Sequence, residues 1–105
     1  MAEPKTLLDA VDLLADRFRA MPQSRLLGAV PGYPSRAAAG LALARRLAAA
    51  ALAAAGEQPR ELPDAGAFAV GDQVAVAGHE LWAASEGEAL SDGLAAVNAV
   101  AELVG

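Results

Sequence analysis

Hydrophobic residues recur every three or four positions near the start of the chain, as they do on one face of an α-helix. The recurring positions are Leu7, Leu8, Val11, Leu14, Ala15 and Phe18. Thr6 precedes them and is a residue type that caps helix N-termini. Pro22 disfavours the helical conformation at the residue before it. The pattern therefore predicts a first helix between Thr6 and Pro22.

Residues 22–34 interrupt the helical pattern. Their three prolines and two glycines exclude a long helix. The segment also carries the apolar residues Leu26, Leu27, Val30 and Tyr33. A solvated linker would be more polar, so we expect this loop to pack over the end of the fold, with one helical turn from Arg25.

A second, longer helix is predicted from Arg36 to Ala55, with Ser35 as its N-cap and Gly56 just after its end. Leucines and small residues form one broad apolar arc of this helix. The opposite arc consists almost entirely of alanine, interrupted by Arg46: Ala38, Ala39, Ala42, Ala49, Ala50 and Ala53. Such a surface is either exposed to solvent without a binding role, or an interface with another copy of the chain or with another protein.

After a polar loop over residues 56–66, the segment 68–84 has two interpretations. As strands, residues 68–70 and 74–76 would form a hairpin around a Gly71-Asp72 turn. As a helix, Val70 and Val74 would align with later apolar residues on one face. A lone hairpin is marginally stable and no other strand is predicted, so we favour the helix.

Gly87 breaks the chain again, and apolar residues from Leu90 to Val104 recur at helical spacing. Four helices joined by these loops predict an all-α fold. We expect one domain spanning residues 1–105, a small antiparallel four-helix bundle with an apolar loop after its first helix.

The composition predicts the kind of core and excludes several classes of binding partner. Hydrophobic residues make up 55% of the 105 positions, but 29 of them are alanine and only four are aromatic, which predicts a thin core. The net charge of −5 argues against binding to nucleic acids or to anionic membranes. Abundant Ala, Arg and Gly with little Lys or Asn is typical of a GC-rich bacterial genome.

No cysteine is present, which excludes disulfides and thiolate chemistry and fits a reducing cytoplasm. The first residues, Met1 to Lys5, do not begin a signal peptide. The most apolar run, Leu47 to Ala55, is far shorter than the ~20 residues of a membrane span. We therefore expect a soluble, cytoplasmic protein.

Residues that carry chemistry are scarce. His79 is the only histidine, and no second histidine or carboxylate stands at a spacing that would share a metal with it. Asp9, Asp12 and Asp16 can approach one another on the first helix, but without a basic or metal partner they form a solvated acidic face. We expect neither an enzyme nor a cofactor.

The sequence favours a protein–protein interaction or structural module, associating with itself or with another protein. Its interface would be the alanine surface at Ala38, Ala42, Ala49 and Ala53. The alternative is a small-molecule-binding domain with a pocket under the 22–34 loop. That pocket would use Arg25, Tyr33, Arg36 and His79.

The scarcity of metal ligands makes a first prediction. Treatment with EDTA should leave the thermal unfolding midpoint unchanged, because one histidine and no cysteine cannot assemble a closed structural site. Differential scanning calorimetry with and without chelator measures this. A large fall in the midpoint would reveal a carboxylate metal site.

Overall fold

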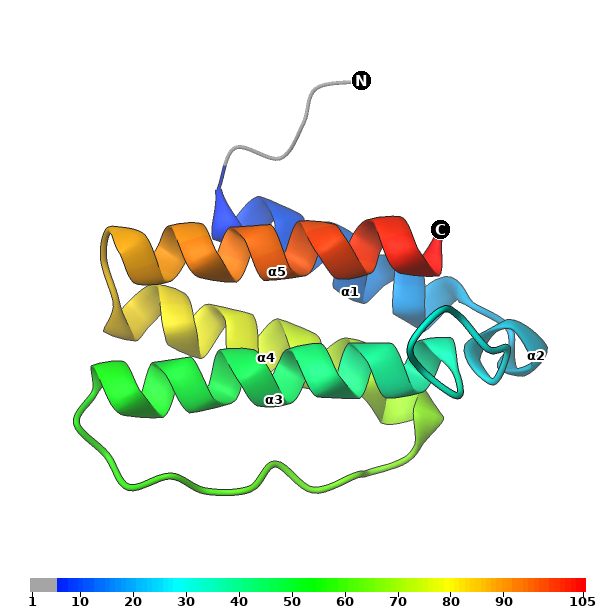
Figure 1. The fold of residues 1–105 in the computed structure, drawn as a ribbon, viewed down its shortest axis with the longest axis horizontal. Helices are drawn as coiled ribbons and strands as arrows, with labels where there is room; N and C mark the ends of the chain where they lie inside the picture. Colours follow the sequence, from blue (N-terminus) through cyan, green and yellow to red (C-terminus); the bar gives the residue numbers. More distant parts are fainter. Residues whose placement is uncertain (1–5) are drawn as a thin grey trace.

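A computed structural model describes residues 6–105, and the predicted absence of a signal peptide at Met1–Lys5 concerns residues outside this range. Figure 1 shows the helices along the chain. They are α1 (Leu7–Ala20), α2 (Gln23–Leu26), α3 (Arg36–Ala54), a short 3-10 helix η1 (Ala67–Ala69), α4 (Val70–Ala84) and α5 (Glu88–Val104). The predicted all-α class is confirmed.

The predicted starts of the first two long helices are confirmed by their caps. Thr6 accepts a hydrogen bond from the backbone N–H of Asp9 at 3.1 Å, and Ser35 accepts one from that of Ala38 at 2.9 Å. Each bond satisfies a backbone donor that the first helical turn leaves free. α3 ends as expected before Gly56, whose φ of 70° lies in the left-handed region that favours glycine.

The ambiguous segment 68–84 is helical, so the hairpin interpretation is wrong. η1 leads directly into α4, and α4 buries both of its glycines against α1. A β-carbon at Gly71 would lie 2.9 Å from the carbonyl oxygen of Ala15, and one at Gly78 would lie 2.5 Å from Val11. The glycines therefore mark close contact between two helices rather than a turn between strands.

The helix directions differ from a simple antiparallel arrangement. α1 and α5 run one way, while α3 and α4 both run the other way (Figure 1). The start of α3 lies beside the start of α4, where a β-carbon at Gly40 would come within 2.4 Å of Val70. The physical reason is the connection 55–69, which is long enough to return along the whole of α3 before the next helix begins.

The 22–34 loop packs on the fold as expected, with a different helical turn. That turn is α2, which begins at Gln23 rather than at Arg25. Leu26 is fully buried, and Val30 pairs with Tyr33 through two backbone hydrogen bonds. Leu27, by contrast, stays 53% exposed.

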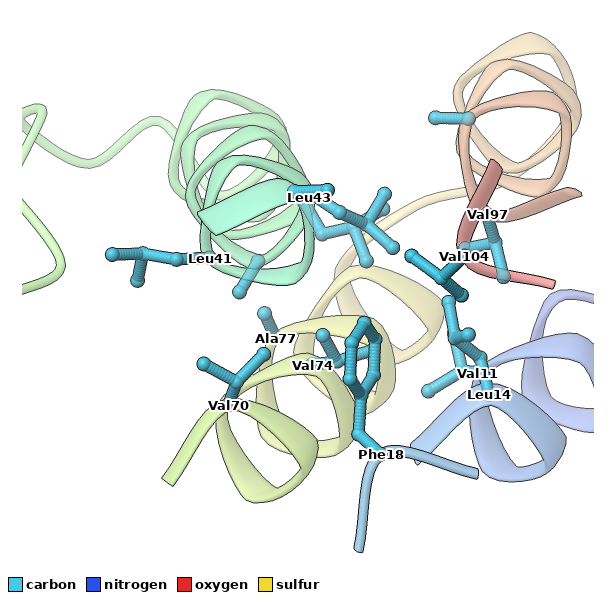
Figure 2. Close-up of a cluster of buried hydrophobic side chains, with 14 of the residues drawn as sticks. Val11, Leu14, Phe18, Leu41, Leu43, Val70, Val74, Ala77, Val97 and Val104 are labelled. Carbon is cyan, nitrogen blue, oxygen red and sulfur yellow. The ribbon is translucent and has the colours of Figure 1, made fainter. Parts of the chain in front are cut away.

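The core is apolar throughout the described residues, with no buried polar or charged residue. Figure 2 shows side chains of α1, α3, α4 and α5 converging on it. Ala39, expected on the outer arc of α3, is completely buried, which corrects that placement. It lies one turn before Leu43, whose side chain is buried on the side of α3 that meets α5.

By length and hydropathy alone, α3 could cross a membrane; its most apolar window has a mean hydropathy of 1.4. Half of that window is buried inside the fold. A core helix of a soluble protein passes the same test, and the contacts of α3 with α4 and α5 fit that role.

Close helix packing makes a second prediction. Gly78→Ala should destabilise the fold by about 1–3 kcal/mol, because the new methyl overlaps both γ-carbons of Val11 and overpacking outweighs the gain in helix propensity. Urea denaturation measures the loss. Adding Val11→Ala supplies the control: it should cost less in the Gly78→Ala background than in the wild type. Strict additivity of the two changes would contradict the proposed contact.

Candidate functional site

Arg25 and Arg36, predicted to line a ligand pocket, meet at the C-terminal turn of α5. The Nε of Arg36 donates to the carbonyl oxygen of Val104 at 3.0 Å. Arg25 donates through Nη2 to the carbonyl oxygens of Val104 at 3.5 Å and Gly105 at 3.1 Å. Arg36 also donates to the backbone oxygen of Arg25 at 3.3 Å, which ties the two segments together.

A third arginine reaches the same turn from another helix. Arg17 of α1 donates to the carbonyl oxygen of Ala101 at 3.3 Å. α5 has no basic residue in its own last turn, so its free carbonyls and the negative end of its dipole depend on these three side chains. We call Arg17, Arg25 and Arg36 the arginine collar. In this structure all three side chains donate hydrogen bonds to backbone carbonyls of the protein itself.

Tyr33 lies beside a pocket between α3 and α5. The pocket has a volume of about 190 Å³ and is mainly aliphatic. It is lined by Tyr33, Ala42, Leu43, Arg46, Ala96, Ala99, Val100 and Leu103. One residue of the predicted interface and one of the predicted ligand site therefore share this pocket.

His79 is not brought together with the other three predicted ligand residues. It lies on α4, and its Nε2 is 2.9 Å from Oδ1 of Asp12 on α1. Arg19 joins the same two helices, with its Nε 2.9 Å from Oδ1 of Asp72. This hydrogen bond raises the pKa of Arg19. Both pairs are about half exposed, and such surface pairs contribute little to stability.

The four predicted interface alanines follow one outward line along α3, which we call the α3 ridge: Ala38, Ala42, Ala49 and Ala53. Ala49 and Ala53 are exposed, and Ala38 and Ala42 are partly buried. Two exposed arginines flank the ridge. Arg45 donates from Nε to the carbonyl oxygen of Leu62 at 2.9 Å, whereas Arg46 lines the α3/α5 pocket.

Two surface features are not among those predicted from the sequence. Leu13 is 56% exposed on α1, although it stands next to buried Leu14. Leu62, in the loop interpreted as polar, is partly buried and helps to enclose a second pocket of about 240 Å³ against α3 and α4. A single leucine among polar residues is the only signal in the sequence for this contact.

Within residues 6–105, no group of three or more His, Asp or Glu side chains is placed to hold a metal ion. The candidate sites are thus a flat helical ridge and shallow aliphatic pockets. Comparison with known proteins found no family model, curated protein or solved structure that matches the chain.

The arginine collar makes a third prediction. Arg36→Met should lower the free energy of unfolding by about 1–3 kcal/mol, since it leaves the carbonyl of Val104 without its closest side-chain donor. Amide hydrogen exchange should also accelerate in the last turn of α5. Arg46→Met is the matched control, because Arg46 makes no side-chain hydrogen bond within residues 6–105, and it should change stability by less than about 0.5 kcal/mol. Equal effects of both changes would contradict the role of the collar.

Proposed function

We propose that this chain is a small helical-bundle module that works by protein–protein association, first of all with another copy of itself. The observation that carries the proposal is the α3 ridge. It runs along the longest helix, faces outward and carries no carboxylate. The side chains of the ridge are alanines, with arginine on either side.

Alanine suits such a surface for two reasons. Its methyl group lets the axis of a second helix come close, near the lower end of the 8–10 Å range of helix packing. It also loses no side-chain rotamer freedom when it is covered. The adjoining α3/α5 pocket offers a recess for a larger apolar side chain of the partner. The ridge can thus be covered at low entropic cost.

We propose that the module is cytoplasmic and has no catalytic role. Nucleic acid is not among its proposed partners. The net charge of −5 supports the last point, because binding to phosphate backbones needs a basic face. The partner is a second copy of the chain or another protein with a complementary helix.

Small-molecule binding is the second candidate, and the pocket at Tyr33 favours it. The phenol and Arg46 stand at an otherwise aliphatic recess, a combination that suits a small apolar ligand with one polar group. A compound library screened by thermal shift distinguishes this candidate, since a ligand of the folded state raises the unfolding midpoint. The hit should lose its effect in Tyr33→Ala.

The α3 ridge makes a fourth prediction. Ala42→Glu combined with Ala49→Glu should convert an associated wild type into a monomer with unchanged helix content. The two carboxylates would be desolvated without partners in the interface, and the longer side chains would hold the second helix away. Sedimentation equilibrium gives the mass, and far-UV circular dichroism gives the helix content.

The matched control places the same two charges elsewhere, as Ala84→Glu with Ala95→Glu. Both alanines are exposed and lie on α4 and α5 rather than on α3. This variant should associate like the wild type. A wild type that is monomeric at high concentration, or a ridge variant that keeps its mass, would refute self-association through the α3 ridge.

A further inference from the structure

The outward face of α1 has the opposite charge to the α3 ridge. At helical spacing, Asp9, Leu13, Asp16 and Ala20 share one face, and all four are exposed. Leu13 stands at its centre, between two carboxylates about one turn away on either side. We call these four residues the α1 face. It presents one large aliphatic side chain between two carboxylates, of which Asp16 already pairs with Arg19 at 3.1 Å.

The charged side chains of α3 are all arginines: Arg36, Arg45 and Arg46. Arg36 is held in the arginine collar, and Arg45 lies beside the ridge with its Nη2 3.9 Å from Oε1 of Glu61. Arg46 is the ridge arginine that makes no ion pair within residues 6–105. A cationic helix is the exception in a chain with 13 acidic and 8 basic residues. The two faces therefore differ in sign, in a protein whose overall charge would make copies repel one another.

The two faces also point in opposite directions. α4 and α5 lie between α1 and α3, which stand diagonally across the fold when it is viewed along the helices (Figure 2). Each helix buries its inner residues toward the shared core, Val11 and Leu14 on α1 and Leu43 and Leu47 on α3. The outward faces of α1 and α3 thus lie on opposite sides of the molecule.

We propose that the α3 ridge of one copy binds the α1 face of the next copy, head to tail. Leu13 covers the alanines between Ala42 and Ala49, and Arg46 pairs with the carboxylate of Asp9. Asp9 makes no ion pair within residues 6–105, and neither does Arg46, so no existing pair has to break. This inference rests on the proposed function and specifies the partner surface.

The geometry determines the type of assembly. Pairing two different faces is heterologous, so a bound pair of copies still has one free α3 ridge and one free α1 face. Growth continues to a ring or an open chain rather than stopping at a dimer. Because opposite charges meet in the interface, association should weaken as salt is raised.

The test uses two variants that each damage a different face. Leu13→Arg replaces the aliphatic centre with a cation facing Arg45 and Arg46. It keeps the fold, because Leu13 is exposed and the new side chain gains Asp9 and Asp16 as neighbours on its own helix. The second variant is the ridge variant, Ala42→Glu with Ala49→Glu. Each should be monomeric alone, with association weakened at least about tenfold.

Mixing the two variants is the decisive step. The Leu13→Arg copy keeps an intact α3 ridge, and the ridge variant keeps an intact α1 face. A head-to-tail interface therefore restores association in the mixture, which sedimentation velocity detects as species heavier than the 10.5 kDa monomer. If the mixture stays monomeric, the intact ridge of one variant does not bind the intact α1 face of the other, and the inference is overturned.

The outcomes also separate this inference from the proposed function. If Leu13→Arg associates like the wild type while the ridge variant does not, α3 forms an interface but α1 is not its partner. If the wild type is monomeric, self-association through the α3 ridge and the head-to-tail inference both fail. Ala95→Glu is the control for a charge added outside both faces, and it should associate normally both alone and in a mixture with the wild type.

Discussion

The fold depends on close approach of helix backbones at buried glycines. In a core made mainly of alanine, valine and leucine, large side chains cannot fill wide gaps, so the helices must come together. Gly40, Gly71, Gly78 and Gly93 occur where a β-carbon would meet a neighbouring helix within 3 Å. All four of these contacts involve α4, which accounts for its central position between α1 and α3.

Close packing brings the helix axes together, and the arginine collar supplies donors to the free carbonyls at the end of α5. The collar draws one side chain each from α1, the α2 turn and α3 to the last turn of α5. Arg25 and Arg36, which the sequence predicts to bind a ligand, therefore donate hydrogen bonds to the backbone of α5. Arg45 is also engaged, through the carbonyl of Leu62 and the carboxylate of Glu61. Arg46, beside the ridge, is the arginine of α3 that makes no ion pair within residues 6–105.

Periodicity and capping residues were enough to predict the helices, because those signals act within a few residues of one another. The caps at Thr6 and Ser35 and the breaks at Pro22 and Gly87 show this. Direction and burial depend on distant contacts. Neither the parallel course of α3 and α4 nor the burial of Ala39 has a local signal. The exposure of Leu13, by contrast, follows from helical spacing, which places it with Asp9 and Asp16 rather than with Val11 and Leu14.

The connection between α3 and α4 separates two parts of the chain that pack mainly against each other. The segments before and after it, α1–α3 and α4–α5, have their most extensive interfaces with each other rather than within themselves. α1 and α3 have little direct contact beyond the ring of Phe18 against Gly40. During synthesis the first half therefore has no surface on which to bury its apolar faces until α4 emerges. The contacts that bury these faces therefore join residues far apart in sequence, a topology associated with slower folding in small proteins.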